Sequence, residues 1–502
     1  MSDFLRMYWD VNKALVKGAA KVGAKAGTAL SGAVGDYSAG RGARRGILAP
    51  GDPAPPPAAG GSYYDFRGVL ALRSVPEDLQ DAEFPLGRYV HPAKGSRQPI
   101  GLPAGVVAHH VAVVAPTGAG KTTSIIVPWI LAGLRAGWRV VTVDVKGDLV
   151  DLLQREALRS SQPLCTQPTV LDYTHPTRSV KWNWLAEIDS DRAIDNAVQS
   201  ILGKEPPPKS DPYFFHLDSQ ILRGLLELTS ISPRRSSVTA SRLLEVLKDQ
   251  GKLSRMLAHH PGSAAAGRLR DLPPLDPDEY SKRVSGVAIR LDALARPMIE
   301  AVTNRADLRV EDVLRAPGLV SVVAPVQDGQ MAAMLSSLFI NQVLFRAYNR
   351  FASSSGVPLL LVLDEAKQLE DRVDFESLLS VARAAQVAAL IAVQDVRQFK
   401  DESQRSIIFS NCGTLIYLSG ASSESAELLS RRVGQHPVQA SSVSVGPSSS
   451  GWGTSTSRSA QTQLVPLLGA REIMDLPFGP HAAVVHSRQL ADRPFLVDLT
   501  RS

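Results

Sequence analysis

The sequence predicts an α/β protein with a mostly parallel sheet, and three observations support this fold class. Short apolar segments alternate with helix-length segments over most of the chain, and one Gly-rich turn lies directly between an apolar strand and a helical segment. Residues 189–317, in contrast, have helical periodicity and no good strand. We therefore expect a sheet covered by helices on both faces, with an all-α domain inserted into it.

Eight segments have the length and apolar character of buried strands. They are residues 111–115, 139–144, 169–172, 319–324, 359–364, 387–393, 414–418 and 481–485. In the insertion, helical periodicity runs through residues 219–228, 240–247 and 280–295. The chain thus divides into an N-terminal segment (1–62), a first part of the α/β domain (63–188), the insertion (189–317) and a second part of the α/β domain (318–502).

Composition excludes several classes of protein. Of the 502 residues, 44% are hydrophobic and 21% are charged, which are globular values and exclude a disordered or collagen-like chain. The longest apolar runs are too short for a membrane span, and no signal peptide is recognisable. Two cysteines, Cys165 and Cys412, are too few for a disulfide framework or a four-thiolate zinc site, and they indicate a reducing compartment.

The net charge of +6 is concentrated near the N-terminus. Residues 1–46 contain eight Lys or Arg and three Asp, so they carry +5 of this total and leave the rest almost neutral. Within residues 1–30, lysines recur every fourth residue at Lys13, Lys17, Lys21 and Lys25, which predicts a basic amphipathic helix. Such a helix could lie on an anionic membrane, contact phosphates or dock on a partner, and a solvated helix without a binding role is the alternative.

Two stretches of low complexity interrupt the pattern of strands and helices. Residues 31–62 are rich in Gly, Ala and Pro and are expected to form a linker. Residues 441–462 are dominated by Ser, Gly and Thr and are expected to form a flexible surface loop. Both interpretations rest on composition alone.

The Gly-rich turn has the pattern of a phosphate-binding loop. It reads Ala-Pro-Thr-Gly-Ala-Gly-Lys-Thr over residues 115–122 and has the strand–loop–helix context that this motif requires. Gly118 and Gly120 let successive N–H groups point at a phosphate, Lys121 can reach the β- and γ-phosphates, and Thr122 can place its hydroxyl on Mg²⁺. The predicted nucleotide-binding residues are Pro116, Thr117, Gly118, Ala119, Gly120, Lys121, Thr122 and Thr123.

A pair of carboxylates follows the apolar run at 359–363. Asp364 is expected at the C-terminal edge of the sheet, where it can hold Mg²⁺ through water. Glu365 is then placed to polarise an attacking water. This pairing is expected for hydrolysis and not for a kinase, so the sequence predicts an enzyme that hydrolyses ATP with Mg²⁺.

Three further side chains are candidates for the same site. Gln394 ends the strand at 387–393 and could sense the γ-phosphate or orient water, or it could be a plain surface glutamine. Arg383 could complete the γ-phosphate site of a neighbouring copy in a ring, with Arg431 and Arg432 as competing candidates and a solvated helix arginine as the alternative. Asp144 ends the strand at 139–144 and is expected near the nucleotide, but the sequence does not indicate its role.

Taken in order, these motifs resemble the type IV secretion coupling proteins, the TraG/TraD kind of conjugative ATPase. The matching segments are Pro-Thr-Gly-Ala-Gly-Lys-Thr (116–122), Val-Asp-Val-Lys-Gly-Asp (143–148), Ser-Val-Lys-Trp-Asn-Trp-Leu (179–185), Leu-Asp-Glu (363–365), Ala-Arg-Ala-Ala-Gln-Val (382–387), Val-Gln-Asp-Val-Arg-Gln (393–398), Asn-Cys-Gly-Thr (411–414), Ser-Arg-Arg-Val-Gly (430–434) and Gly-Ala-Arg-Glu-Ile-Met-Asp-Leu-Pro (469–477). The helical insertion lies where that family carries its all-α domain.

The resemblance implies a RecA-like P-loop ATPase that forms a homohexameric ring and moves DNA, including single-stranded DNA, or brings substrates to secretion machinery. It also implies that Gln394 is a nucleotide sensor and that Arg383 acts in trans. That family usually has N-terminal membrane spans and none is recognisable here, so we expect a cytoplasmic protein with peripheral contact at the inner face of the cell membrane through residues 1–30. Two alternatives remain: a nucleotide-gated adaptor that recruits protein partners, and a DNA pump of the FtsK or HerA kind.

Overall fold

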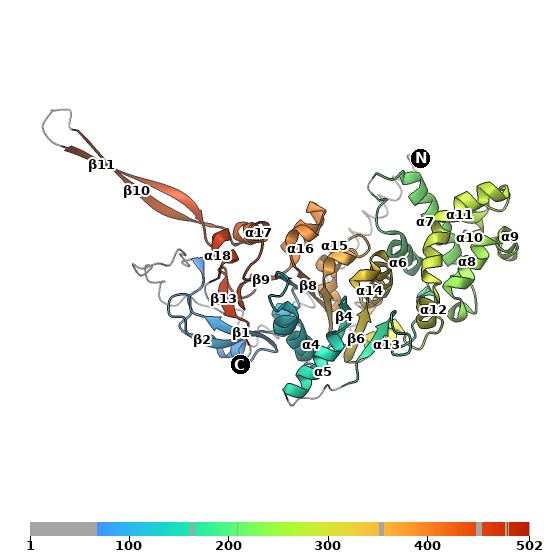
Figure 1. Ribbon diagram of the computed structural model, residues 1–502, viewed down its shortest axis with the longest axis horizontal. Coiled ribbons are helices and arrows are strands. Elements are labelled where there is room, and N and C mark those ends of the chain that lie inside the picture. The colour runs from blue at the N-terminus through green and yellow to red at the C-terminus, as the bar shows by residue number, and fades with distance from the viewer. Residues whose placement is uncertain are drawn as a thin grey trace.

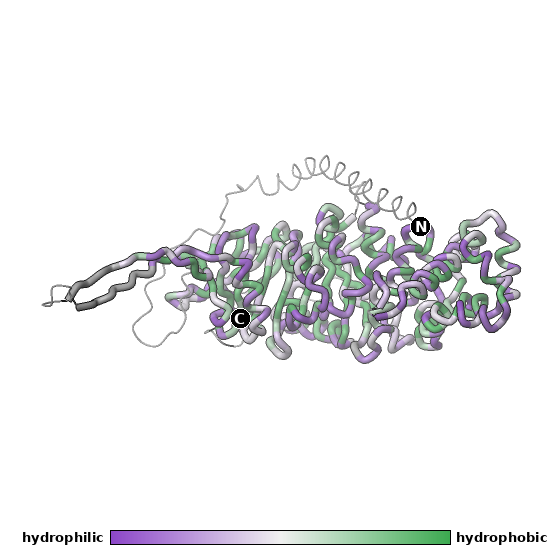
Figure 2. The backbone as a smooth tube through the Cα atoms, turned by 90° about the horizontal axis from the view of Figure 1, so that it is seen from above, coloured by the Kyte–Doolittle hydropathy of each residue, from purple (hydrophilic) through white to green (hydrophobic). Residues whose placement is uncertain are grey.

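The computed structural model describes residues 68–160, 164, 166–207, 209–350, 356–447, 454–476, 479 and 481–500. The expected helix over residues 1–30, the expected linker at 31–62 and Cys165 lie outside the described residues. The described part is elongated, with a central α/β body between an all-helical end and a long two-stranded hairpin (Figure 1, Figure 2).

Seven parallel strands form the larger part of the central sheet, in the order β5-β6-β4-β7-β8-β3-β9. They are β3 (Val111–Val114), β4 (Arg139–Asp144), β5 (Thr169–Asp172), β6 (Gly318–Val323), β7 (Leu359–Asp364), β8 (Val387–Val393) and β9 (Thr414–Leu418). All seven match predicted strands. Every residue of β3, β4, β6, β7, β8 and β9 is buried, which explains why these strands have continuous apolar runs.

Four antiparallel strands extend the sheet beyond β9, in the order β12 (Ala482–Ser487), β13 (Phe495–Asp498), β1 (Phe84–Val90) and β2 (Arg97–Leu102). The predicted strand at 481–485 corresponds to β12. The other three strands were not predicted. Pro85 and Gly87 interrupt the pattern of β1 at a register shift, and its partner β13 lies at the other end of the chain.

Helices cover both faces of the sheet, as expected. In β3, Val111 and Val113 belong to one core, whereas Ala112 and Val114 belong to the other. The first core includes residues of α4 (Val127–Arg135) and α5 (Leu149–Arg159). The second includes residues of α14 (Gln330–Arg350), α15 (Phe375–Val381), α16 (Glu402–Asn411) and α17 (Ser423–Val433).

Between β5 and β6 the described chain is helical, which confirms the inserted all-α part. Its helices are α6 (Asp191–Leu202), α7 (Pro212–Ser230), α8 (Ala240–Lys248), α9 (Gln250–His259), α10 (Ala264–Leu269), α11 (Pro277–Leu294), α12 (Pro297–Thr303) and α13 (Val310–Arg315). Side-chain oxygens of Ser190, Asp211 and Thr239 accept backbone N–H groups at the first turns of α6, α7 and α8, so the sequence defines where these helices begin.

Several short elements complete the chain. They are α2 (Glu77–Gln80), α3 (Ala104–Val107), α18 (Ala470–Met474), a π-helical turn η2 (Thr122–Ile126) and the 3₁₀ turns η3 (Trp184–Glu187), η4 (Arg235–Ser237), η5 (Val326–Asp328), η6 (Ala366–Leu369), η7 (Ala382–Ala385) and η8 (Val396–Gln398). Among the described helices, none combines the length and the apolar character that crossing a membrane requires.

The Ser-rich stretch forms strands where we expected a flexible loop. β10 (Gln435–Pro447) and β11 (Thr454–Pro466) are each 13 residues long and pair along their whole length, from Gln435↔Pro466 to Pro447↔Thr454. The loop prediction is therefore wrong for residues 441–447 and 454–462. Val and Thr recur between the serines of these segments, and their preference for extended backbone is the signal that the composition concealed.

Candidate nucleotide-binding site

The Gly-rich segment forms the turn that connects β3 to η2 and α4. Its first residue, Ala115, donates its backbone N–H to the carbonyl of Val393 in β8 at 3.0 Å, which ties the loop to the neighbouring strand. Gly118 and Gly120 have φ values of +82° and +85°, a region that side chains disfavour, so the curl of the loop depends on glycine at both positions. A loop of this shape directs backbone N–H groups at a bound phosphate.

Lys121 brings the loop into contact with the two carboxylates. Its Nζ lies 2.7 Å from Asp364 Oδ1 and 3.3 Å from Glu365 Oε1. Asp364 is the last residue of β7 and is buried, whereas Glu365 is half-buried. Glu365 has φ +62°, a left-handed conformation that is costly for a residue other than glycine and is often found at functional sites.

Gln394 connects the same carboxylate to the loop. Its Nε2 donates to Glu365 Oε1 at 2.8 Å, and its Oε1 accepts a hydrogen bond from Thr117 Oγ1 at 2.8 Å. Glu365 Oε1 thus accepts hydrogen bonds from both Gln394 Nε2 and Lys121 Nζ. The carboxyl ends of β3, β7 and β8 therefore contribute to one polar network, because parallel strands end at the same edge of a sheet.

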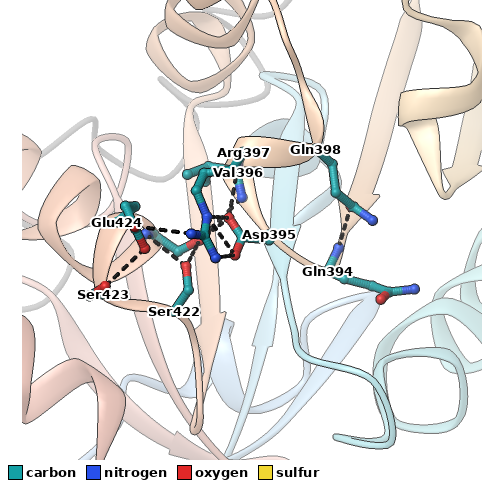
Figure 3. A network of polar contacts seen from close by, with 9 residues as sticks. Gln394, Asp395, Val396, Arg397, Gln398, Ser422, Ser423 and Glu424 are labelled. Atoms are coloured by element: carbon teal, nitrogen blue, oxygen red, sulfur yellow. Dashed lines mark hydrogen bonds and ion pairs between the residues drawn. The ribbon is translucent and has the colours of Figure 1, made fainter.

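The loop after β8 has polar contacts of its own, which hold the backbone of Gln394 in place (Figure 3). The Gln394 backbone N–H donates to Gln398 Oε1 at 2.9 Å. Arg397 pairs with Asp395 at 2.9 Å and with Glu424 of α17 at 3.0 Å. Burial opposes ionisation of Asp395, but hydrogen bonds, chiefly from Arg397, lower the pKa of its carboxyl below the ordinary value.

Asp144, whose role the sequence left open, shapes the turn after β4. Its carboxylate accepts the backbone N–H groups of Lys146, Gly147 and Leu149 at 3.0, 2.8 and 3.0 Å. Burial raises the pKa of Asp144, and the three hydrogen bonds oppose that rise. This carboxylate therefore holds the start of α5.

Arg383 lies at the opposite edge of the sheet, where the parallel strands begin. It belongs to η7, directly before β8, and its side chain is exposed. His109 and His110 precede β3 at the same edge, and the pKa of each is lowered to about 4 by burial, with a further contribution from Arg383. The structure therefore does not bring Arg383 to Lys121 or Glu365 of its own chain.

Other arginines continue this amino edge. Arg432, near the end of α17, donates from Nη2 to the Cys412 carbonyl at 2.6 Å, and burial together with Arg488 lowers the pKa of Arg432 to about 10. Burial and these two arginines also lower the pKa of His486 to about 4. Among the described residues, no carboxylate forms an ion pair with Arg383, Arg432 or Arg488. Arg383, Arg432 and Arg488 therefore place positive charge at the amino edge.

His481 lies beside the loop and was not indicated by any sequence motif. A Cβ added to Gly120 would lie 3.6 Å from His481 Nδ1. His481 precedes β12, and the antiparallel pairing of β12 with β9 returns it to the carboxyl edge. Only this long-range pairing could have revealed it.

Comparisons with known proteins agree with this architecture. The family described as type IV secretory system conjugative DNA transfer matches residues 87–487. The chain is 23% identical over 354 residues to protein VirD4 of Rhizobium rhizogenes, covering 67% of this chain and 50% of the relative. It is 25% identical over 411 residues to the conjugal transfer protein TraG of Escherichia coli, covering 74% and 62%. The chain therefore spans about half the length of the VirD4 relative.

Solved structures show the same fold. The unbound monoclinic form of the bacterial conjugative coupling protein TrwBdeltaN70 has a TM-score of 0.59 at 19% identity, covering 80% of this chain and 87% of that chain. The plasmid coupling protein TrwB in complex with ADP and Mg²⁺ has a TM-score of 0.58 at 18% identity, with coverage of 80% and 87%. Its complex with the ATP analogue ADPNP gives 0.58 at 17%, also covering 80% and 87%. The expected RecA-like α/β fold with an all-α insertion is thus confirmed.

Proposed function

Because the chain belongs to the family of type IV secretory system conjugative DNA transfer proteins, we propose that it is an ATP-hydrolysing ring motor. It would move DNA or deliver substrates to a secretion or DNA-transfer machine. The observation that carries the proposal is the network of Lys121, Asp364, Glu365 and Gln394 at the carboxyl edge. A cation, two carboxylates and an amide at a phosphate-binding loop are the groups that hydrolysis of a nucleoside triphosphate requires.

ATP and Mg²⁺ are the ligands we propose, and TrwB has been crystallised with ADP and Mg²⁺ and with an ATP analogue. The donor set fits a hard cation, because Thr122 offers a hydroxyl and Asp364 a carboxylate. Asp364 is buried and its Oδ1 lies 2.7 Å from Lys121 Nζ, which places this carboxylate beside the lysine that can reach the β- and γ-phosphates, where the metal would bind. When bound, Mg²⁺ would neutralise charge on the β- and γ-phosphates.

Each side chain of the network then has a separate task. Lys121, held between the two carboxylates, is placed to reach the γ-phosphate end. Glu365 Oε1 is engaged by Lys121 and Gln394, which leaves Oε2 to accept a proton from the attacking water. Gln394 fixes the orientation of Glu365 and can hold the same water through its amide.

We further propose that the chain forms a homohexameric ring in which Arg383 acts on the site of the neighbouring copy. Arg383 lies at the edge of the sheet opposite to Lys121, so it can reach a nucleotide only in another chain. Head-to-tail contacts of this kind join two different surfaces, and they form a ring when the rotation between copies closes. The arginines at the amino edge of one copy would face the carboxyl edge of the next, where the carboxylates of Asp364 and Glu365 lie, which is electrostatically favourable.

DNA, including single-stranded DNA, and proteins of the secretion machinery are the proposed partners. The test is the ATPase rate of the purified chain with no addition, with single-stranded DNA and with double-stranded DNA. Stimulation by DNA would support the motor. Stimulation by a partner protein but not by DNA would favour a nucleotide-gated adaptor, and a response to double-stranded DNA without any secretion partner would favour an FtsK- or HerA-like pump.

A cytoplasmic location with peripheral contact at the inner face of the cell membrane is proposed from residues 1–30. Their lysines, spaced by four, suit an anionic lipid surface. Deleting residues 1–46 should weaken co-sedimentation with anionic vesicles while basal ATP hydrolysis is unchanged. If binding to both vesicles and DNA stays the same after the deletion, the segment has neither role.

A further inference from the structure

A hollow of about 600 Å³ opens beside the phosphate-binding loop. Its borders include Thr123 and Ser124 of η2, Arg155 and Ser160 of α5, His481 before β12 and Thr500 after β13. Lys121, Asp364, Glu365 and Gln394 do not line it. The hollow is therefore a space next to the loop that hydrolysis itself leaves unused.

The order of residues along the loop gives the direction in which a triphosphate would lie. Lys121 contacts Asp364 and Glu365, so these carboxylates mark the γ-phosphate end. In such loops the lysine reaches the β- and γ-phosphates, whereas backbone N–H groups hold the α- and β-phosphates. Thr123 and Ser124, which follow Lys121, border the hollow. A triphosphate with its γ end at Glu365 therefore directs its nucleoside towards the hollow.

His481, Leu499 and Thr500 form one wall of the hollow, and hydrogen bonds fix the backbone of this wall. The Leu499 backbone N–H donates to the His481 carbonyl at 2.9 Å. The Thr500 backbone N–H donates to Asp498 Oδ1 at 2.9 Å, and Asp498 also forms an ion pair with Arg97 of β2. The imidazole of His481 is exposed and flanks Gly120. A flat aromatic ring thus lies at the rim, and the backbone carbonyl of His481 is bound to the N–H of Leu499.

The opposite wall adds positive charge. Arg155 and Arg159 both line the hollow from α5. Arg155 Nε donates to the carbonyl of Asp151 on its own helix, and the Arg159 guanidinium lies 4.0 Å from Glu156. The two arginines exceed the single carboxylate of Glu156 in this wall, which favours an anionic ligand such as a nucleotide over a neutral one.

We propose that this hollow binds the nucleoside part of the nucleoside triphosphate, with the base stacked on the His481 imidazole beside the loop residues Thr123 and Ser124. The inference rests on the proposed function, since it requires a triphosphate on the loop at 116–123. Bases stack on flat aromatic side chains with little dependence on their identity, so the site would select nucleotides over bare polyphosphates and would distinguish bases weakly.

The test compares two ligands that differ only in the nucleoside. Dissociation constants for ATP and for inorganic tripolyphosphate, both with Mg²⁺, are measured by calorimetry on the full chain and on its variants. His481→Ala should weaken ATP binding about tenfold and tripolyphosphate binding much less, because tripolyphosphate lacks the base that would stack on the imidazole. His481→Phe keeps a flat ring and should restore most of the ATP affinity. His259→Ala, an exposed histidine at the end of α9, is the matched control.

The outcomes separate this inference from the proposed function. Equal weakening of both ligands by His481→Ala, or no weakening of ATP binding, overturns the nucleoside site. Lys121→Ala should weaken both ligands, and if it weakens neither, the loop itself is wrongly assigned. A thermal melt of each variant verifies that the chain is folded, and His481→Phe supplies a second answer if the alanine variant is not.

Discussion

The two edges of the parallel sheet carry different polar side chains. At the carboxyl edge, Asp364, Glu365 and Gln394 converge on Lys121. At the amino edge, Arg383 lies near His109 and His110, and further arginines follow towards β12. The strands are the same at both edges, so the difference arises from the turns that precede and follow them.

From this difference we propose that one chain holds two halves of a site that it cannot complete alone. Parallel strands place all their carboxyl ends at one edge, so no folding within the chain can bring Arg383 to its own Lys121. A ring of identical copies would join the amino edge of one chain to the carboxyl edge of the next. The comparison predicts that changes at the carboxyl edge act within a chain and changes at the amino edge act between chains.

The largest effect is expected from changes at the carboxyl edge. Lys121→Ala and Glu365→Gln should each reduce ATP turnover to background, a loss of about 10⁴-fold, because the first would remove the proposed phosphate contact and the second the proposed general base. A coupled ATPase assay measures this loss. Lys282→Ala and Glu376→Gln, exposed residues of α11 and α15, are matched controls and should keep the full rate. Unchanged turnover in both site variants would show that ATP is not hydrolysed at the carboxyl edge.

Arg383→Ala tests the amino edge and should lower turnover by about 10³-fold without weakening nucleotide binding to the single chain. Mixing Arg383→Ala chains with Lys121→Ala chains should restore part of the rate, because a mixed ring pairs an intact loop with an intact arginine. A mixture that is no faster than its components would show that Arg383 does not act between chains.

Arg431→Ala provides the control for that experiment, because Arg431 is exposed near the end of α17. It should keep nearly the full rate. If Arg431→Ala or Arg432→Ala loses turnover while Arg383→Ala does not, an arginine of α17 and not Arg383 completes the site of the neighbouring copy.

Gln394→Ala should have a smaller effect, a loss of roughly 10²-fold in turnover with little change in nucleotide affinity. The amide positions Glu365 through a 2.8 Å hydrogen bond and does not itself accept the proton. Gln394→Glu is the informative companion, because it keeps the length but places a second carboxylate beside Glu365. Rates and affinities are measured separately, and a pure loss of affinity would contradict the positioning role.

Local patterns were sufficient to predict the parallel sheet and the glycine-rich loop between β3 and η2. An apolar run followed by a polar turn identifies β7 with Asp364, and the same reasoning placed Gln394 at the end of β8. Their convergence could be predicted because parallel strands end together. The same reasoning places Arg383 at the opposite edge, because it directly precedes the predicted strand at 387–393. Whether a neighbouring copy brings Arg383 to a nucleotide cannot be predicted from the pattern of one chain.

The strands β1, β2 and β13, and the position of His481 beside the loop, required information that no local segment contains, whereas β12 was predicted from its apolar run. Arg97 and Asp498, which form an ion pair beside β13, are 401 positions apart in the chain. Pro85 and Gly87 in β1 also weaken the strand pattern there. The β10–β11 hairpin was missed for another reason, since its Ser-rich composition suggested a loop although its strands pair in full register.

The smallest expected effect is a dependence of stability on pH that belongs to the amino edge. His110 has φ +63°, and its Nδ1 accepts the backbone N–H of Ala389 at 3.1 Å, which requires the neutral imidazole. Its pKa of about 4 in the folded chain lies below the value of about 6.5 expected when unfolded, so the unfolded state binds more protons between these values. Stability is therefore complete above about pH 6.5 and falls as the pH decreases towards about 4.

His110→Asn isolates this contribution. Asparagine tolerates the left-handed backbone and offers Oδ1 as an acceptor, but it does not titrate in this range. Thermal melts of both chains between about pH 7 and about pH 5 should show a smaller decrease in melting temperature for His110→Asn than for the unaltered chain. Part of the decrease should remain, because burial and nearby arginines hold the pKa of His109 and of His486 at about 4 as well. Identical decreases in the two chains would mean that His110 is not the titrating group, whereas ATP turnover at pH 7 should be the same in both.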